Sequence, residues 1–127
     1  LGTNDFGYLA YDASGTAYDA RPPLNATTYT DAMVSFVRSI QTHYKNAQFF
    51  LMTSPMLSDY YPTTEDAQHT TMSNALKDAI SQIGENAHLV DWPTQGSEVG
   101  CDYHPNAATH ANEAEVLASA ISSVLGW

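Results

Sequence analysis

Short apolar runs alternate with segments whose apolar residues recur at helical spacing, and this alternation limits the possible folds most. Residues 47–53 and 87–92 are runs of the kind found in buried parallel strands. Helical spacing is clear in residues 28–45, 72–83 and 106–125. Helices of this length between parallel strands act as crossover connections. The sequence therefore predicts an α/β fold, a three-layer α/β/α sandwich with a parallel sheet.

Capping residues predict where the three long helices begin and end. Thr28 with Asp31 resembles a capping box, and Asn106 can cap the last helix. Gly84 and Gly126 are expected to end the second and third helices. The predicted apolar faces are Tyr29, Ala32, Met33, Phe36, Val37, Ile40 and Tyr44; Met72, Ala75, Leu76, Ala79, Ile80 and Ile83; and His110, Ala114, Leu117, Ala118, Ile121, Val124 and Leu125.

The start of the chain reads as the tail of a buried strand that turns into a loop. Residues 1–5 (Leu-Gly-Thr-Asn-Asp) contain turn formers directly after an apolar residue. Residues 6–26 carry Gly, Pro, Asp and Ser without any period, which predicts a long loop. The chain has no initiator Met, so we expect residues 1–127 to be the C-terminal portion of a single, longer domain.

The charge balance narrows the classes of partner. Fourteen acidic and four basic residues give a net charge of −10. Phosphate-rich partners need clustered Lys and Arg, so the composition argues against nucleic acid and against anionic membrane surfaces. No apolar run approaches the roughly 20 residues of a membrane-spanning helix. Neutral or weakly charged substrates remain.

Composition and one short motif favour a secreted protein. Lys is scarce, while Tyr, Thr, Ser and Asn are frequent. Residues 25–27 (Asn-Ala-Thr) form an N-glycosylation sequon beside Pro22-Pro23, where a surface loop is expected, so Asn25 is a candidate glycosylation site. Cys101 is the single cysteine, so no disulfide can close within these residues.

The residues best suited to catalysis or ligand binding follow predicted strand ends. These are Asn4-Asp5, the loop from Ser54, and residues 102–104 (Asp-Tyr-His). Ligands of parallel sheets gather at the carboxyl ends of the strands, so we expect all three segments at one edge. A carboxylate that holds an imidazole in one tautomer makes it a competent general base. The alternative is an ordinary polar loop in which His104 bonds a backbone carbonyl.

Other histidines offer weaker hypotheses. His104 and His110 with Asp102 could bind a metal, but their spacing across a Pro-Asn break is poor for this. His43 and the remaining histidines have no partner at metal-ligand spacing, which favours structural roles.

Two blocks of sequence carry a resemblance to a known family. Residues 2–5 (Gly-Thr-Asn-Asp) and 102–106 (Asp-Tyr-His-Pro-Asn) resemble signature blocks of the SGNH (GDSL-like) hydrolases, most closely the acetyl esterases of carbohydrate esterase family two. The resemblance implies a flavodoxin-like sandwich and a secreted serine esterase that deacetylates plant polysaccharides. It implies neither a metal nor another cofactor.

The resemblance also implies a role for each site residue. His104 would be the general base and then the general acid, oriented by Asp102. Asn4 would donate its side-chain amide to the oxyanion of the tetrahedral intermediate. Tyr103 would lie against a sugar ring. Asp5 would contact the substrate or brace the loop.

One departure from the family is large. The family's serine lies in a Gly-Asp-Ser block, and these residues contain no such block. The family's glycine oxyanion donor is also missing. Ser97 lies in a loop and lacks the strand-to-helix elbow of a nucleophile. We therefore expect the serine to come from a segment upstream of this chain. The alternatives are a non-catalytic carbohydrate-binding module that kept the fold, and an SGNH lipase or other esterase.

Overall fold

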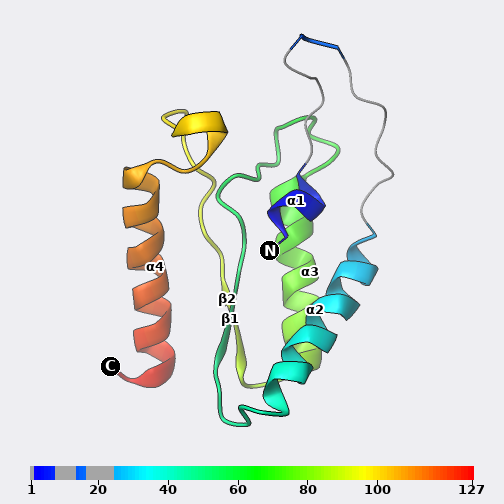
Figure 1. Ribbon diagram of the computed structural model, residues 1–127, viewed down its shortest axis with the longest axis vertical. Helices are drawn as coiled ribbons and strands as arrows, with labels where there is room; N and C mark the ends of the chain where they lie inside the picture. Colours follow the sequence, from blue (N-terminus) through cyan, green and yellow to red (C-terminus); the bar gives the residue numbers. More distant parts are fainter. Residues whose placement is uncertain (1, 8–13, 17–24) are drawn as a thin grey trace.

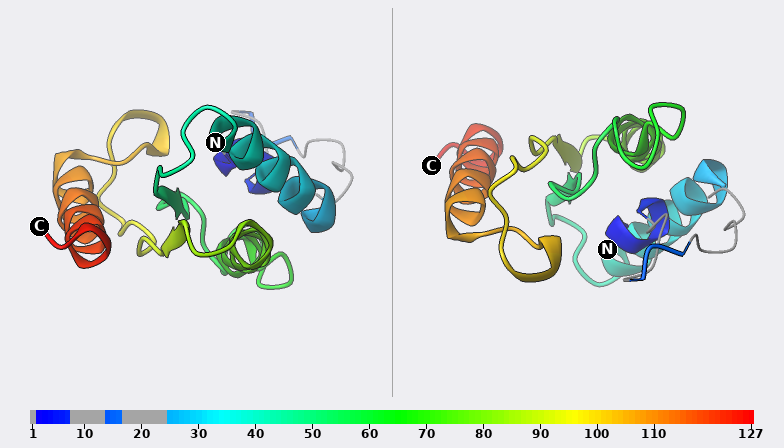
Figure 2. Two further views of the ribbon diagram at one scale, coloured as in Figure 1. Left: turned by 90° about the horizontal axis from the view of Figure 1, so that it is seen from below. Right: turned by 90° about the horizontal axis from the view of Figure 1, so that it is seen from above.

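The computed structural model describes residues 2–7, 14–16 and 25–127. Helices lie on both sides of a parallel sheet: α1, α2 and α3 cover one side and α4 the other (Figures 1 and 2). In chain order the elements are α1 (Thr3–Phe6), α2 (Ala26–Gln41), β1 (Phe49–Met52), α3 (Gln68–Ile83), β2 (Ala87–Val90), the 3₁₀ turn η1 (Cys101–Tyr103) and α4 (Ala107–Leu125). The predicted α/β fold is confirmed. None of the described helices is long and apolar enough to cross a membrane.

The sheet within the described residues has two strands, joined by the crossover helix α3. They pair in parallel with Phe49 opposite Ala87 and Met52 opposite Val90. The pairing continues past the strand ends, where the Thr53 hydroxyl accepts a 2.8 Å hydrogen bond from the backbone N–H of Trp92. Both strands therefore end together, and the segments that follow them start from the same edge.

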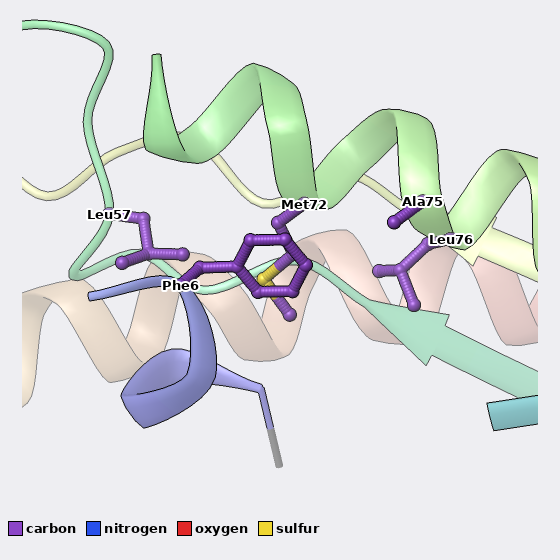
Figure 3. Packing of buried hydrophobic residues seen from close by; sticks show 5 residues of the cluster. All are labelled: Phe6, Leu57, Met72, Ala75 and Leu76. Atoms are coloured by element: carbon purple, nitrogen blue, oxygen red, sulfur yellow. The ribbon is translucent and has the colours of Figure 1, made fainter. Parts of the chain in front are cut away.

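The main core lies between α3, α1 and the segment after β1. Met72, Ala75 and Leu76 of α3 pack against Phe6 of α1 and against Leu57 (Figure 3). Where α2 crosses α3, the buried hydroxyl of Thr30 donates a 3.1 Å hydrogen bond to a backbone carbonyl of α3. The α3 face that faces the core is the one predicted from the spacing.

The beginning of α2 differs from the capping prediction. Asn25, three residues ahead of Thr28, caps α2: its side chain accepts a 3.1 Å hydrogen bond from the Thr28 N–H. The capping box of Thr28 and Asp31 is therefore wrong, because Thr28 already lies inside the helix. Asn106 caps α4, and Gly84 and Gly126 end α3 and α4, as predicted.

The cap of α3 comes from a distant loop. Ala67, directly before the helix, has a left-handed φ of 39° and offers no side-chain cap. Instead, the carboxylate of Asp59 accepts a 2.8 Å hydrogen bond from the Thr70 N–H and a 2.5 Å one from the Thr70 hydroxyl. These two bonds from Thr70 hold the pKa of Asp59 below its usual value, and the bond from the hydroxyl has the larger effect.

The start of the chain forms a helix where a strand tail and loop were predicted. The backbone N–H groups of Asp5 and Phe6 both donate 3.0 Å hydrogen bonds to the carbonyl of Gly2. The ring of Phe6 is then buried edge-on against Tyr29, with ring centroids 4.7 Å apart. Burial of this ring favours the helical turn over an extended chain. Leu1 and much of the predicted loop, residues 8–13 and 17–24, lie outside the described residues.

Two predicted apolar surfaces are less buried than their sequences suggest. β1 was expected to be a buried strand, yet its residues are half-buried and Met52 is 36% exposed. Along α4, Val124 and Leu125 are also exposed, and Glu113 is the buried residue. The reason is the limited contact of both elements: β1 pairs with β2 along one edge, and α4 packs on β2.

Candidate active site

Three segments meet beyond the carboxyl ends of the strands, and hydrogen bonds join them in series. The Thr3 hydroxyl of α1 donates a 2.9 Å bond to the hydroxyl of Ser54, directly after β1. The neighbouring Pro55 carbonyl accepts a 2.8 Å bond from the N–H of Gln95, in the loop after β2. Gln95 then donates its Nε2 hydrogen to the carbonyl of Tyr103, at 2.7 Å. The three segments predicted to share one edge do so (Figure 1).

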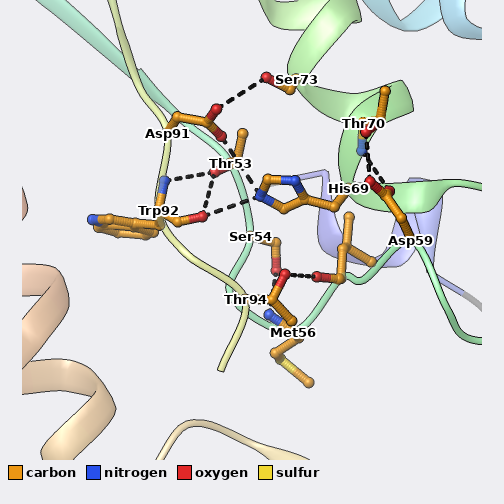
Figure 4. Close-up of polar contacts among 11 residues, drawn as sticks. Thr53, Ser54, Met56, Asp59, His69, Thr70, Ser73, Asp91, Trp92 and Thr94 are labelled. Carbon is orange, nitrogen blue, oxygen red and sulfur yellow. Dashed lines mark hydrogen bonds and ion pairs between the residues drawn. The ribbon is translucent and has the colours of Figure 1, made fainter. Parts of the chain in front are cut away.

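The segment after β1 is packed and bonded as part of the scaffold. Ser54 is 4% exposed, and its hydroxyl also accepts a 3.3 Å bond from the Met56 N–H. Thr94 donates a 2.9 Å bond to the carbonyl of Leu57, which gives a second link between the two loops (Figure 4). Ser54 is therefore a buried structural hydroxyl that holds α1 against the end of β1.

The loop that carries His104 closes on itself. The Gly100 N–H donates to the His104 carbonyl at 2.7 Å, and the His104 N–H donates to the Cys101 carbonyl at 3.1 Å. A Cβ at Gly100 would lie 3.1 Å from the His104 carbonyl oxygen and 3.2 Å from that of Pro105. Any larger residue at position 100 would crowd this turn.

Two adjacent residues in this turn adopt left-handed backbone conformations. Asp102 has a φ of 53° and Tyr103 a φ of 60°. Asp accepts this region with modest strain, whereas a bulky aromatic residue rarely does. Strained backbone of this kind persists where the surroundings hold it, and it clusters at functional sites. Here the bond from Gln95 to the Tyr103 carbonyl is one of the contacts that hold it.

Asn106 fixes the other end of the loop. Its Oδ1 accepts a 2.9 Å bond from the Thr109 N–H, which caps α4. Its Nδ2 donates a 2.7 Å bond to the carbonyl of Glu98. One side chain thus joins the start of α4 to the loop ahead of His104, and only its capping role was predicted.

The predicted site residues are accessible at this edge. Asp102, His104 and Tyr103 are exposed, and Tyr103 exposes 73% of its surface. Asn4 and Asp5 are exposed on α1. No hydrogen bond or ion pair joins Asp102 to His104 within the described residues, so the orienting role of Asp102 stays a prediction. The role of Asn4 as oxyanion donor also stays a prediction.

A second histidine lies near the strand ends but in a different setting. The Nε2 of His69, in the first turn of α3, lies 3.1 Å from the Trp92 carbonyl and 3.5 Å from a carboxylate oxygen of Asp91. Ser73 bonds the other oxygen of Asp91 at 3.4 Å (Figure 4). These contacts tie the start of α3 to the end of β2, which is a structural arrangement.

The histidine of α4 is paired with a different carboxylate from the one considered for a metal site. The Nδ1 of His110 lies 3.2 Å from Glu113 rather than joining Asp102 and His104. Across the described residues, no group of three His, Cys, Asp or Glu side chains is close enough to hold a metal ion.

The sequence reasoning missed Gln95 and Asp59, which hold the loops at this edge. Gln95 joins the segments after β1 and β2, and Asp59 reaches α3 from the loop after β1. Neither residue is part of a hydrophobic periodicity or a short motif. The one signal in the sequence was that Ala67, the residue before α3, cannot cap a helix, so the cap had to come from another residue.

No family model matches the chain, but individual proteins do. It is 27% identical over 129 residues to the cellulase/esterase CelE of Acetivibrio thermocellus, a match that covers 100% of the chain and 14% of CelE.

Solved structures are also similar. One is a carbohydrate esterase family 2 enzyme plus carbohydrate binding domain from Corynascus thermopiles (Myceliophthora fergusii), 62% identical with a TM-score of 0.89, covering 100% of this chain and 36% of that one. Another is a family two carbohydrate esterase from Clostridium thermocellum in complex with cellohexaose, 27% identical with a TM-score of 0.69, covering 100% and 35%. The chain thus spans about a third of these structures, and the predicted resemblance to carbohydrate esterase family two is confirmed.

Proposed function

We propose that this chain, which is similar over its whole length to carbohydrate esterase family 2 enzymes, forms the histidine-bearing part of a serine esterase that deacetylates polysaccharides. The observation that carries the proposal is the hydrogen-bonded link from the turn of His104, through Gln95, to the segment after β1. That segment holds α1, with Asn4, at the same edge through Ser54. General base and oxyanion donor must approach one reacting carbonyl, and a shared edge permits this.

The proposed reaction proceeds through an acetyl-enzyme. A serine hydroxyl from outside these residues attacks the acetyl carbonyl while His104 takes the hydroxyl proton. The ester bond to the sugar breaks, and His104 returns that proton to the leaving sugar oxygen. Water then attacks the acetyl-serine, its proton going to His104 and on to the serine oxygen, and acetate is released. The Asn4 amide donates to the oxyanion in both halves, and Asp102 orients the imidazole.

The nucleophile is proposed to come from the segment that precedes this chain in the complete protein. The 127 residues contain no Gly-Asp-Ser block, and the chain corresponds to 36% and 35% of the similar solved enzymes. The remainder of such a protein is long enough to supply the serine. Expressed alone, these 127 residues should therefore release no acetate.

The proposed substrate is an acetylated, uncharged polysaccharide. The net charge of −10 disfavours anionic polymers, and the solved enzyme from Clostridium thermocellum is in complex with cellohexaose. Tyr103, which exposes 73% of its surface beside His104, can cover one face of a sugar ring, and Asp5 is the second candidate contact.

Secretion and glycosylation at Asn25 are part of the same proposal. Asn25 is exposed, and its Oδ1 accepts the capping bond of α2, so a glycan on Nδ2 leaves that bond intact. A Thr27→Ala variant removes the sequon and keeps Asn25. Secretion of the full-length protein from a eukaryotic host should yield a glycan mass that this variant lacks; equal masses would refute glycosylation at Asn25.

The proposal is tested by acetate release from the full-length protein with His104→Ala. Acetylated xylan and an aryl acetate serve as substrates. Turnover should fall by about 100-fold to 10,000-fold, the usual contribution of a general base. His43→Ala is the matched control, because His43 is exposed beyond the end of α2. Unchanged turnover in His104→Ala would remove His104 from the mechanism.

The absence of a Gly-Asp-Ser block from these residues keeps a second function open, that of a non-catalytic carbohydrate-binding module. The complete sequence separates the two: a Gly-Asp-Ser block upstream favours the esterase, and its absence favours the binder. A binder would retain acetylated xylan without releasing acetate. Among enzymes, a steep fall of activity with acyl length would separate an acetyl esterase from a lipase.

A further inference from the structure

We propose that Asn106 is a positioning residue for His104, because its side-chain amide both caps α4 and closes the turn that carries the imidazole. The inference rests on the proposed esterase function, since it concerns where the general base is held. Three observations carry it: the two ends of the Asn106 amide, the pairing inside the turn, and the anchoring of α4.

The imidazole of His104 depends on its backbone for its position. His104 is exposed, and among the described residues its side chain forms no hydrogen bond or ion pair. The backbone that carries it includes Asp102 and Tyr103, both left-handed, with φ of 53° and 60°. Backbone of this kind persists only where its surroundings hold it. The contacts that hold the two ends of this turn therefore determine where the imidazole lies.

Two hydrogen-bonded pairs hold the turn, one inside the other. The inner pair is the bond from the Gly100 N–H to the His104 carbonyl, at 2.7 Å. The outer pair is the bond from the Asn106 Nδ2 to the Glu98 carbonyl, also at 2.7 Å. His104 belongs to the inner pair and lies two residues from the outer one, so both pairs restrict its backbone.

The cap of α4 fixes the direction of the Asn106 amide. Its Oδ1 accepts hydrogen bonds from the Thr109 N–H at 2.9 Å and from the Thr109 hydroxyl at 3.2 Å. Turning the amide over would point its NH₂ group at the Thr109 N–H, so that two donors would face each other. The oxygen therefore stays on the helix, and the nitrogen is directed at Glu98.

Capping alone does not require asparagine at position 106. Ser, Asp and Asn cap helices about equally well. Of these, Asn alone has an amide, with an acceptor and an N–H donor on the same carbon. An Asp carboxylate would face the Glu98 carbonyl with another acceptor. A Ser hydroxyl ends one bond closer to the backbone and would lose contact with that carbonyl. The second role, closing the turn, is thus the one that needs Asn106.

The helix to which Asn106 joins the turn is itself held at the strand ends. The indole Nε1 of Trp92, just after β2, donates a 3.2 Å hydrogen bond to the Glu113 carbonyl in the second turn of α4. The N–H of Trp92 bonds the hydroxyl of Thr53, just after β1, at 2.8 Å. Asn106 therefore connects the His104 turn, through α4, to the ends of both strands (Figure 1).

The substitution Asn106→Ser separates the two roles in the full-length protein. Serine keeps the cap of α4 and loses the bond to the Glu98 carbonyl. We expect kcat for an aryl acetate to fall by about 10-fold to 100-fold with KM nearly unchanged, because a displaced catalytic group slows the chemical step. The melting temperature should fall no further than in the control variant, and the kinetics are measured well below it.

Asn25→Ser is the matched control. Asn25 caps α2 in the same way, with its Oδ1 accepting a 3.1 Å hydrogen bond from the Thr28 N–H. Wild type and both variants are produced in a bacterial host, so that a glycan on Asn25 does not enter the comparison. Asn25→Ser should keep both kcat and KM. An equal fall of kcat in both variants would assign the loss to weaker capping and would overturn the proposal.

Amide hydrogen exchange, resolved by NMR, gives a readout that needs no substrate. In Asn106→Ser the amides of Gly100 and His104, which are bonded inside the turn, should exchange about 10-fold or more faster than in the wild type. The Thr109 amide, which is bonded to the cap, should keep its protection. Unchanged exchange at Gly100 and His104 would contradict the proposal.

The kinetic outcomes separate this inference from the esterase proposal. An inactive His104→Ala with an unchanged kcat in Asn106→Ser would leave the esterase in place and rule out the positioning role. A rise in KM alone would assign Asn106 to substrate binding and would also rule it out. Full turnover in His104→Ala would overturn the esterase proposal, and this inference with it.

Discussion

The side-chain nitrogen of Gln95 lies 2.7 Å from the carbonyl oxygen of Tyr103 and donates a hydrogen bond to it. The backbone N–H of the same Gln95 is bonded to the Pro55 carbonyl after β1. Gln95 therefore connects the turn that carries His104 to the segment that follows β1. A proposed general base that is exposed on a loop needs such a support, because small displacements of a catalytic group are costly.

Gln95 should act as a positioning residue, and Gln95→Leu tests this in the full-length protein. The substitution removes the bond to Tyr103 while the backbone bond to Pro55 remains. We expect kcat for an aryl acetate to fall by about 10-fold to 100-fold, with KM nearly unchanged and a stability loss of about 1 kcal/mol. Gln82→Leu, at an exposed position of α3, is the matched control. A rise in KM alone would assign Gln95 to substrate binding.

Tyr103 should contribute to polysaccharide binding and little to the chemical step. Tyr103→Asn keeps a residue that accepts the left-handed backbone and removes the aromatic ring. KM for acetylated xylan should rise by about 10-fold, the effect of losing roughly 1.4 kcal/mol of contact. KM for a small aryl acetate should stay the same. Equal effects on both substrates would mean that the ring supports the loop and does not contact the polymer.

Asp59 should stabilise α3 in a pH-dependent way. Its pKa is lowered by the hydrogen bonds from Thr70, so its contribution is present above the unfolded pKa of about 4. It is lost as the pH falls through the lower folded pKa. Asp59→Ala should cost about 1 kcal/mol at neutral pH, as for other helix caps, and progressively less in acid.

Denaturant unfolding of wild type and Asp59→Ala between neutral pH and pH of about 3 measures this difference. Asp78→Ala removes an exposed carboxylate of the same helix and serves as the control. A stability gap between wild type and Asp59→Ala that is independent of pH would rule out the charged cap.

Because of the buried phenol of Tyr29, the free energy of unfolding should decrease at alkaline pH. Its pKa is raised by burial and by the charge of Asp5, so the folded state keeps the phenolic proton after the unfolded chain has lost it. Stability is thus complete below the unfolded pKa of about 10 and declines as the pH rises above it. Tyr29→Phe should lack this decline, whereas Tyr44→Phe, at a 66% exposed position, should retain it. Unfolding free energies measured above neutral pH compare the three proteins.

The elements whose apolar residues recur at a regular spacing were predictable from the sequence. The elements that depend on contacts between distant residues were not. The spacing of Met72, Ala75 and Leu76 predicted the buried face of α3, and the apolar runs predicted both strands. The first turn, α1, depends on burial of Phe6 against Tyr29, a contact over more than twenty positions that no local pattern records.

The placement of the candidate site was predictable from the sequence, but the conformation of its loop was not. The order of the elements was enough to bring Asn4, Ser54 and His104 to one edge of the sheet. The left-handed pair at Asp102 and Tyr103 was not predictable, because Asp adopts this backbone region only in some contexts and a bulky aromatic residue rarely does. Its support by Gln95 depends on how two loops meet, and loop contacts have no period in sequence.

The account depends most on His104 acting as the base, and chemical rescue tests that role directly. Full-length His104→Ala is assayed for acetate release with and without added imidazole, which can enter the space left by the side chain. The account predicts a loss of about 100-fold or more that imidazole partly restores, with no effect of imidazole on His43→Ala. Turnover that is unchanged by His104→Ala would contradict the esterase mechanism proposed here.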